Sequence, residues 1–152
     1  MLPRWFHGYA LVRKVEDDSI RWLVLRTSGG GIDLVHGPRL ERESFRETAT
    51  REVTWQLGLN RDSDFLVSTM ATLNLEFEAV LPGTCQPQHV AVAFYPVDVY
   101  RTAVLQRLDA EPRCLWLNSA QLCSGRAPGG EQLHPVTLEL INRFEIVQAW
   151  QQ

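Results

Sequence analysis

The segment from Gly37 to Leu59, GPRLERESFRETATREVTWQLGL, is the part of the chain whose residue types and spacing could do chemistry. Positions three and four apart on a helix share one face, so Glu52, Trp55 and Gln56 would stand side by side. Such a face could hold a divalent cation, because Mg²⁺ prefers oxygen ligands and carboxylates above all. Only Glu52 offers a carboxylate here. The amide oxygen of Gln56 is a much poorer ligand, and the indole of Trp55 offers no oxygen.

A helix from Ser44 to Leu57 is predicted by the residues at its two ends. Ser44 and Glu47 form the S-x-x-E pattern of a capping box, which satisfies two backbone N–H groups at a helix start. Gly58 is the residue type that ends a helix in the left-handed conformation. Apolar residues also recur at intervals of four and would face a core: Phe45, Ala49 and Val53.

The same segment resembles the Nudix box, G-x5-E-x7-R-E-U-x-E-E-x-G-U, in which U is a bulky apolar residue. Seven of its nine specified positions match at the required spacing and without a gap: Gly37, Glu43, Arg51, Glu52, Val53, Gly58 and Leu59. The resemblance implies an α/β fold, a Nudix-like α/β/α sandwich with a mixed β-sheet. It also implies hydrolysis of nucleoside diphosphates linked to another group. Within the family, the expected opening hairpin and the Asp33-Leu34-x-x-Gly37 pattern are most similar to diadenosine tetraphosphate hydrolases.

The two departures from the box fall on its Glu-Glu pair, which is replaced here by Trp55 and Gln56. In the family, this pair and the preceding Glu present three carboxylates to Mg²⁺ or Mn²⁺. The resemblance therefore implies Glu52 and Gln56 as metal ligands, with weak binding of the cation or none. A further carboxylate would have to come from outside the box, and Glu111 is the first candidate by position. Two others follow: Glu76 and Glu78.

The resemblance also implies roles for the other matching charged residues. Glu43 and Arg51 are expected to form the ion pair that ties the loop to the helix. Together with Glu52 they make up the implied catalytic residues, Glu52 as the remaining metal ligand or base. Retention of the Glu43–Arg51 pair fits a preserved scaffold and does not by itself indicate preserved catalysis.

Three residues are the candidates for contact with a substrate. His36 and Gly37 lie where family members have a loop near phosphate; for His36, a partly solvated loop histidine without that role is the alternative. Trp55 would stack on a nucleobase or fill the former metal position. The other interpretation is that Trp55 packs at the surface or at the edge of the core.

The remaining elements are predicted from apolar patterns and turn residues. Strands are expected at 5–14, 20–26, 32–35, 89–99 and 114–117, with two short strands or one bent strand within 65–81. The first two strands should form a hairpin. A brief helix is expected from Asn118-Ser119 through Leu122, and a last helix from Pro135 through about Val147.

Composition narrows the function classes. The 152 residues suit one domain, 1–152, and a net charge of -3 argues against a nucleic-acid partner. The most apolar run, Val90 to Val97, is too short to cross a membrane, and the first residues lack the apolar core of a signal peptide. We therefore expect no membrane partner and a cytoplasmic location. Three cysteines without a C-x-x-C pair argue against a disulfide framework and a zinc site. A homodimer stays open.

Two functional hypotheses follow. In the first, the chain is a divergent Mg²⁺- or Mn²⁺-dependent pyrophosphohydrolase whose activity is weak, because two carboxylates are missing. In the second, it is a non-catalytic domain that binds a nucleotide or related metabolite in the same cleft, or serves a partner protein.

Overall fold

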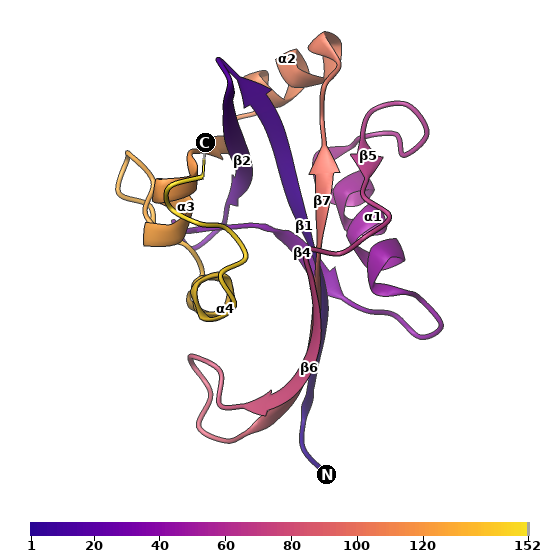
Figure 1. Ribbon diagram of the computed structural model, residues 1–152, viewed down its shortest axis with the longest axis vertical. Helices are drawn as coiled ribbons and strands as arrows, with labels where there is room; N and C mark the ends of the chain where they lie inside the picture. Colours follow the sequence, from indigo (N-terminus) through magenta and orange to yellow (C-terminus); the bar gives the residue numbers. More distant parts are fainter. Residues whose placement is uncertain (152) are drawn as a thin grey trace.

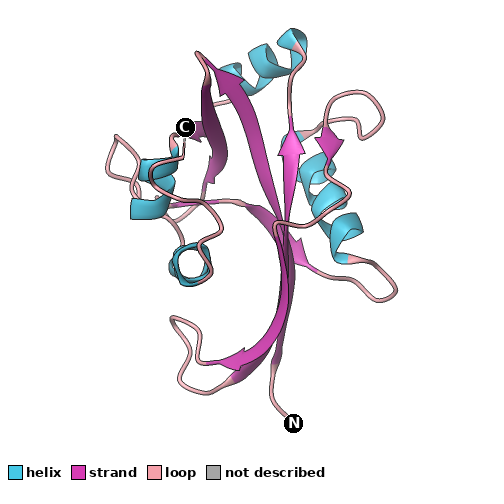
Figure 2. Ribbon diagram, viewed as in Figure 1, coloured by secondary structure: helices cyan, strands magenta, loops and turns pink. Residues whose placement is uncertain are grey.

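The computed structural model describes residues 1–151, which are built around an eight-stranded mixed β-sheet (Figures 1 and 2). The strands are β1 (Arg4–Glu16), β2 (Ser19–Arg26), β3 (Ile32–Asp33), β4 (Val35–Pro38), β5 (Leu66–Val67), β6 (Leu73–Ala79), β7 (Gln88–Asp98) and β8 (Cys114–Leu117). The helices are α1 (Phe45–Leu57), α2 (Thr102–Ala110), α3 (Ser119–Ser124) and α4 (Pro135–Arg143).

The long strands β1 and β7 form the centre of the sheet and run parallel, from the pair Arg4 and His89 to the pair Arg13 and Asp98. β2 pairs antiparallel with the second half of β1, which confirms the expected hairpin. β4 pairs antiparallel with the first half of β1, and β6 with the first half of β7. The residues around Gly37 are therefore part of the sheet and lie directly beside β1.

Helices cover both faces of the sheet, with α1 on one side and α3 and α4 on the other (Figure 1). Neighbouring residues of a strand point to opposite faces, so Tyr9 packs toward α4 whereas Ala10 packs toward α1. Each face has its own hydrophobic cluster: one includes Leu140 of α4 and the other Val53 of α1. The predicted α/β/α sandwich is thus confirmed.

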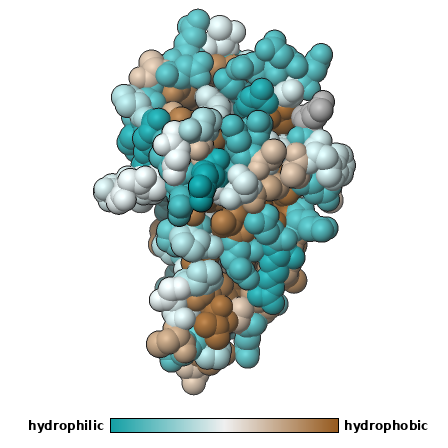
Figure 3. All heavy atoms as spheres, turned by 90° about the vertical axis from the view of Figure 1, so that its left-hand side faces the viewer, coloured by the Kyte–Doolittle hydropathy of each residue, from teal (hydrophilic) through white to brown (hydrophobic). Residues whose placement is uncertain are grey.

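The side of the molecule that carries α3 and α4 is mostly hydrophilic at its surface, with hydrophobic atoms showing between polar ones (Figure 3). They are most evident in the lower part of that view. Several large side chains are only partly covered where they pack against this hydrophobic cluster: Trp5, Phe77 and Phe144.

The approach of α1 to the sheet depends on Gly8. A β-carbon at this position would lie 2.8 Å from the backbone oxygen of Phe45 and 2.9 Å from Cβ of Thr48. Both distances are too short for any side chain, so only glycine lets the helix lie this close to β1. The close approach brings the polar face of α1 against β4.

The ends of α1 agree with the sequence. The hydroxyl of Ser44 accepts from the backbone N–H of Glu47 at 3.1 Å, and the Glu47 carboxylate accepts from the N–H of Ser44 at 3.1 Å. Gly58 ends the helix in the left-handed conformation, with φ 66° and ψ 32°. The capping box and the helix-ending glycine are both confirmed.

Three expected elements differ in the structure. The strand expected at 32–35 is two strands, because Ile32–Asp33 pairs with β2 whereas Val35–Pro38 pairs with β1. Helix α2 was not predicted; its start has no side-chain cap, and Val104 and Leu108 are its buried residues. The last helix ends at Arg143 instead of Val147, because Glu145 adopts a left-handed φ of 51° that a helix cannot contain.

None of the helices within residues 1–151 has both the length and the apolar character needed to cross a membrane.

Candidate functional site

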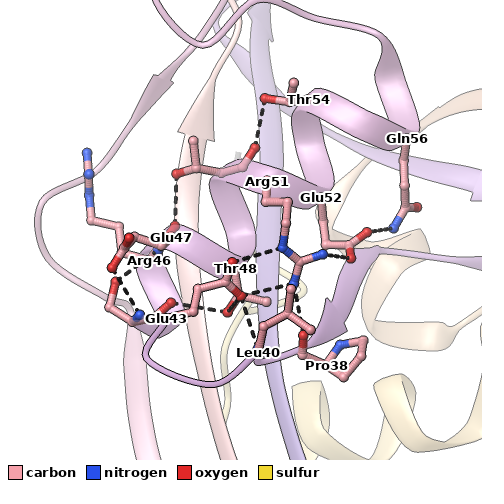
Figure 4. Close-up of polar contacts among 12 residues, drawn as sticks. Pro38, Leu40, Glu43, Arg46, Glu47, Thr48, Arg51, Glu52, Thr54 and Gln56 are labelled. Carbon is pink, nitrogen blue, oxygen red and sulfur yellow. Dashed lines mark hydrogen bonds and ion pairs between the residues drawn. The ribbon is translucent and has the colours of Figure 1, made fainter.

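The side chain of Arg51 binds the loop that precedes α1. Its Nε and Nη2 donate to the two carboxylate oxygens of Glu43 at 2.9 and 3.0 Å, and Nη2 also donates to the backbone oxygen of Pro38 at 2.9 Å (Figure 4). Hydrogen bonds from Arg51 and Thr48 lower the pKa of Glu43 from its ordinary value to about 2. The expected ion pair between loop and helix is therefore present, in the two-pronged geometry that arginine favours.

The carboxylate of Glu52 is buried, and each of its oxygens accepts a hydrogen bond from a neighbour. Nη1 of Arg51 donates to Oε1 at 2.6 Å, and Nε2 of Gln56 donates to Oε2 at 2.7 Å (Figure 4). The same Nε2 donates to the backbone oxygen of His36 at 3.0 Å. Since this atom faces two acceptors, it must be the amide nitrogen of Gln56 and not its oxygen.

Gly37 is required by the position of Glu52. A β-carbon on Gly37 would lie 2.2 Å from Oε1 of Glu52 and 2.5 Å from its carboxylate carbon. The carboxylate therefore packs directly on the backbone of β4, in space that any other residue would fill. Gly37 and Glu52 are brought together as the sequence suggested, and their contact is steric.

Trp55 lies on the outer side of α1 and is 71% exposed. The guanidinium carbon of Arg51 is 5.3 Å from the centre of its ring. The indole lines a cavity of about 510 Å³ between α1 and the segment 61–67. The interpretation that Trp55 fills the former metal position is wrong, because Gln56 and Arg51 occupy the surroundings of Glu52. Packing at the surface and stacking on a ligand both stay open.

His36 lies within β4, and not in a loop as expected. Its Nε2 is 2.8 Å from the carboxylate of Asp33, and its Nδ1 is 3.0 Å from Nδ1 of His7. The ring of Tyr9 stacks on it at 4.4 Å, and the ring of Trp5 stacks on His7 at 3.8 Å. These side chains form a polar and aromatic group on the face of the sheet that looks toward α4.

The directions of the hydrogen bonds in this group can be worked out from its fixed ends. The hydroxyl of Thr137 donates to Asp33 at 2.6 Å, so the hydroxyl of Tyr9 must donate to Thr137, at 3.3 Å. His36 then donates through Nε2 to the acceptor carboxylate of Asp33. The contact between Nδ1 of His36 and Nδ1 of His7 needs one proton, which either ring can carry.

Burial, followed by the nearby His36, lowers the pKa of His7 from 6.5 to about 4, so its ring is neutral at pH 7. We did not expect Trp5, His7 and Tyr9 to be site residues. The signal was their alternation along β1, which places all three on one face.

No protein-family model matches the sequence, and no curated protein is similar to it. Among solved structures, the chain is similar to RenU, a Nudix hydrolase from M. smegmatis, at 16% identity over 95% of this chain and 86% of that chain, with a TM-score of 0.60. It is similar to the Ap4A hydrolase of C. elegans at 11% identity over 82% of this chain and 86% of that chain, with a TM-score of 0.53.

A third similar structure is the Nudix domain of Shewanella oneidensis NrtR complexed with ADP ribose. Identity is 12% over 95% of this chain and 88% of that chain, with a TM-score of 0.55. The chain has the Nudix fold. The expected Nudix-like architecture is thus confirmed.

The Nudix fold implies a divalent cation beside α1, but the side chains present do not fit one. Of the three carboxylate positions, only Glu52 keeps its carboxylate, and the charge of Arg51 already compensates it. Gln56 turns its nitrogen toward Glu52, and an amide nitrogen cannot ligate Mg²⁺. Within residues 1–151, no three His, Cys, Asp or Glu side chains are grouped so that they could hold a metal ion.

The structure does not bring Glu111 to this position, contrary to expectation. Glu111 follows α2 and is held by Arg113, whose Nε donates to it at 3.0 Å. Arg113 also donates to the backbone oxygen of Gln56 at 2.9 Å, so Arg113 is the group that contacts the end of α1. The other two candidates lie on exposed positions of β6, where Glu76 is 3.4 Å from His89.

Chemically, the network of Glu43, Arg51, Glu52 and Gln56 holds the loop, β4 and α1 together. A metal ligand or a general base needs oxygen lone pairs directed at a cation or a water molecule. In Glu52 the two oxygens are directed at Arg51 and Gln56 instead. This arrangement supports a rigid scaffold better than it supports metal-assisted hydrolysis.

Proposed function

We propose that this chain binds a nucleotide-like ligand, a nucleoside diphosphate linked to another group, and hydrolyses its pyrophosphate weakly or not at all. The observation that carries the proposal is the hydrogen bond from Nε2 of Gln56 to Oε2 of Glu52, at 2.7 Å. A donor stands where the Nudix box has a carboxylate.

The replacement of a glutamate by Gln56 removes the need for a cation beside Glu52. Two carboxylates at 52 and 56 would repel each other unless a cation or a proton lay between them. With Gln56, the amide takes over the contact and Glu52 needs no metal to be satisfied. Binding of Mg²⁺ beside Glu52 would therefore have to overcome the positive charge of Arg51, with one carboxylate as the protein's ligand.

Binding of a ligand is supported by two observations. The similar Nudix domain of NrtR is complexed with ADP ribose, which is a nucleoside diphosphate linked to a sugar. In this chain, the stacked rings of Trp5 and His7 are only partly buried on the sheet face, and such planar side chains suit contact with a base or a sugar. We extend the ligand class from NrtR to this chain on the shared fold.

The hydrolase is the second candidate. It is favoured by the retained scaffold, in which Glu43, Arg51 and Gly37 have the contacts described above. Mn²⁺ or Mg²⁺ held by Glu52 and the phosphates of the substrate would be its cofactor. The expectations of one domain, no nucleic-acid or membrane partner and a cytoplasmic location stay predictions.

The test combines binding with turnover. Calorimetric titration with ADP-ribose should give the same Kd in EDTA and in Mg²⁺, because the proposed binding does not use the cation. Hydrolysis of ADP-ribose, nucleoside triphosphates and a dinucleoside tetraphosphate should stay at the level of the Glu52→Gln variant. Turnover that needs Mg²⁺ or Mn²⁺ and is lost in Glu52→Gln would support the hydrolase instead.

The double substitution Trp55→Glu with Gln56→Glu restores the carboxylates of the box and serves as the matched positive control. It should bind Mn²⁺ at least tenfold more tightly than the wild-type chain. If it does not, the missing carboxylates are not what limits metal binding, and the argument from Gln56 is wrong.

A further inference from the structure

A cavity of about 370 Å³ lies beside the start of the loop that leads to α1. It is separate from the hydrogen bonds around Glu52 and is lined by Arg4, Phe6, His7, Pro38, Arg39, Leu40 and Glu41. These residues come from two neighbouring segments, the beginning of β1 and the end of β4 with the residues that follow it.

Two arginines in this cavity share one aromatic ring. The guanidinium carbon of Arg4 is 5.5 Å from the ring centre of Phe6, and that of Arg39 is 5.7 Å from it. Phe6 is in turn held edge-on by the ring of His89, at 5.2 Å. Two positive groups are therefore gathered around a side chain that is itself fixed.

The backbone keeps both arginines in place. The N–H of Arg39 donates to the backbone oxygen of Phe6 at 2.9 Å, which extends the pairing of β4 with β1 by one residue. Arg4 is opposite His89 at the start of the parallel pair of β1 and β7. A site on paired strands is better defined than one on a free loop.

Neither guanidinium forms an ion pair with a carboxylate within residues 1–151. Arg13, Arg51 and Arg113 each have a carboxylate at 3.0 Å or less. Arg4 and Arg39 make no ion pair and no side-chain hydrogen bond in the described part of the chain, apart from their contacts with aromatic rings. An anion from solution would supply the opposite charge and the acceptors for both groups.

The charges and hydrogen-bonding groups of the cavity indicate which class of ligand it would bind. Glu41 is the only acidic residue of the cavity, so the two arginines leave a net positive charge. Arg4 and Arg39 are hydrogen-bond donors only, so the ligand must supply acceptors. The oxygens of a phosphate or diphosphate meet this requirement and carry the opposite charge.

We propose that this cavity is a phosphate site, in which Arg4 and Arg39 bind the phosphate or diphosphate of the ligand. The identity of the ligand as a nucleotide rests on the proposed function. The contact of the arginines with phosphate does not, and inorganic pyrophosphate can test it alone.

The experiment is calorimetric titration of the whole chain with inorganic pyrophosphate and with ADP-ribose, both in EDTA. Arg4→Ala and Arg39→Ala should each raise the Kd for both ligands by about tenfold, and the double variant should raise it further. Arg126→Ala is the matched control: it removes the same charge from an exposed arginine in the loop after α3 and should leave both affinities unchanged. Thermal unfolding of each variant shows whether it is folded.

The outcomes separate the two proposals. If the wild-type chain binds both ligands and the Arg4 and Arg39 variants bind as tightly as it does, the phosphate site is wrong and the proposed function stands. If it binds pyrophosphate through these arginines and not ADP-ribose, the site stands and the nucleotide function fails. If it binds neither, or if the control loses as much affinity as the two variants, the phosphate site is overturned.

Discussion

Nε2 of Gln56 lies 2.7 Å from Oε2 of Glu52, at a position where the Nudix box has two glutamates. This contact gives the buried carboxylate of Glu52 a hydrogen-bond donor from the protein itself. Arg51 supplies the positive charge and Gln56 supplies the second hydrogen bond. Glu52 thereby becomes part of the packing of α1 on β4.

Gln56→Glu should destabilise the chain at neutral pH by about 1–3 kcal/mol, because the new carboxylate faces Glu52 with no donor between them. One of the two pKa values is then raised in the folded state. A raised carboxyl pKa favours the folded state at low pH, so the deficit should shrink as pH falls from 7 to 5. Urea unfolding at both pH values measures it. An equal deficit at both pH values would contradict the electrostatic explanation.

Arg51→Ala should cost about 3–5 kcal/mol, because it leaves Glu43 and Glu52 partly buried without their cation. Arg51→Lys keeps the charge but not the two-pronged geometry, and it should recover only part of the loss. Denaturant unfolding of both variants checks the prediction. A loss below about 1 kcal/mol in the alanine variant would mean that this network behaves as an exposed surface pair.

The low pKa of Glu43, about 2, predicts an acid-sensitive contribution to stability. Because the folded-state value is below the ordinary 4.5, the contribution is present above pH 4.5 and is lost as pH falls from 4.5 toward 2. Solvent at the rim of the ion pair limits it to about 1–2 kcal/mol. Unfolding curves for the wild type and Glu43→Gln should converge over this interval. Parallel curves would show that Glu43 is not the group responsible.

Gly37→Ala should destabilise by about 1–3 kcal/mol, because the added carbon overlaps the carboxylate of Glu52. The loss should be smaller in a Glu52→Ala background, in which the overlapping atoms are gone. A double-mutant cycle measures the difference as a coupling energy. If the two substitutions add without coupling, the contact between Gly37 and Glu52 is not the reason for the glycine.

His7 should stay neutral down to about pH 4 in the folded chain. Its unfolded-state pKa is 6.5, so the unfolded chain takes up a proton first and stability should fall as pH decreases from 6.5 to 4. NMR titration of the imidazole gives the pKa directly. In His36→Phe the nearby imidazole is lost, and the pKa of His7 should move back toward its ordinary value. A pKa of His7 near 6.5 in the wild type would contradict the burial of this ring beside His36.

The sequence predicted those parts of the fold that depend on local signals. The caps of α1, the opening hairpin and the ion pair of Glu43 with Arg51 all have short motifs. Helix α2 was missed because Arg101 gives it no side-chain cap. The end of α4 was misplaced because the apolar pattern continues to Val147, which is buried although it lies beyond the helix.

The site was predictable only in part, because its remaining contacts are between segments distant in the chain. Glu111 seemed well placed by position, but its partner Arg113 lies two residues further on. The group of His7, His36 and Thr137 joins β1, β4 and α4. The sequence does not specify that these three elements are neighbours in the fold. The direction in which Gln56 turns its amide also depends on the backbone oxygen of His36.

The most direct test of the central claim is calorimetric titration of ADP-ribose into the wild-type chain, once in EDTA and once in Mg²⁺, with the products analysed afterwards. We predict the same Kd in both solutions and intact ADP-ribose at the end. Binding that requires Mg²⁺, together with cleavage that Glu52→Gln abolishes, would show that Glu52 still serves a metal and would contradict the account.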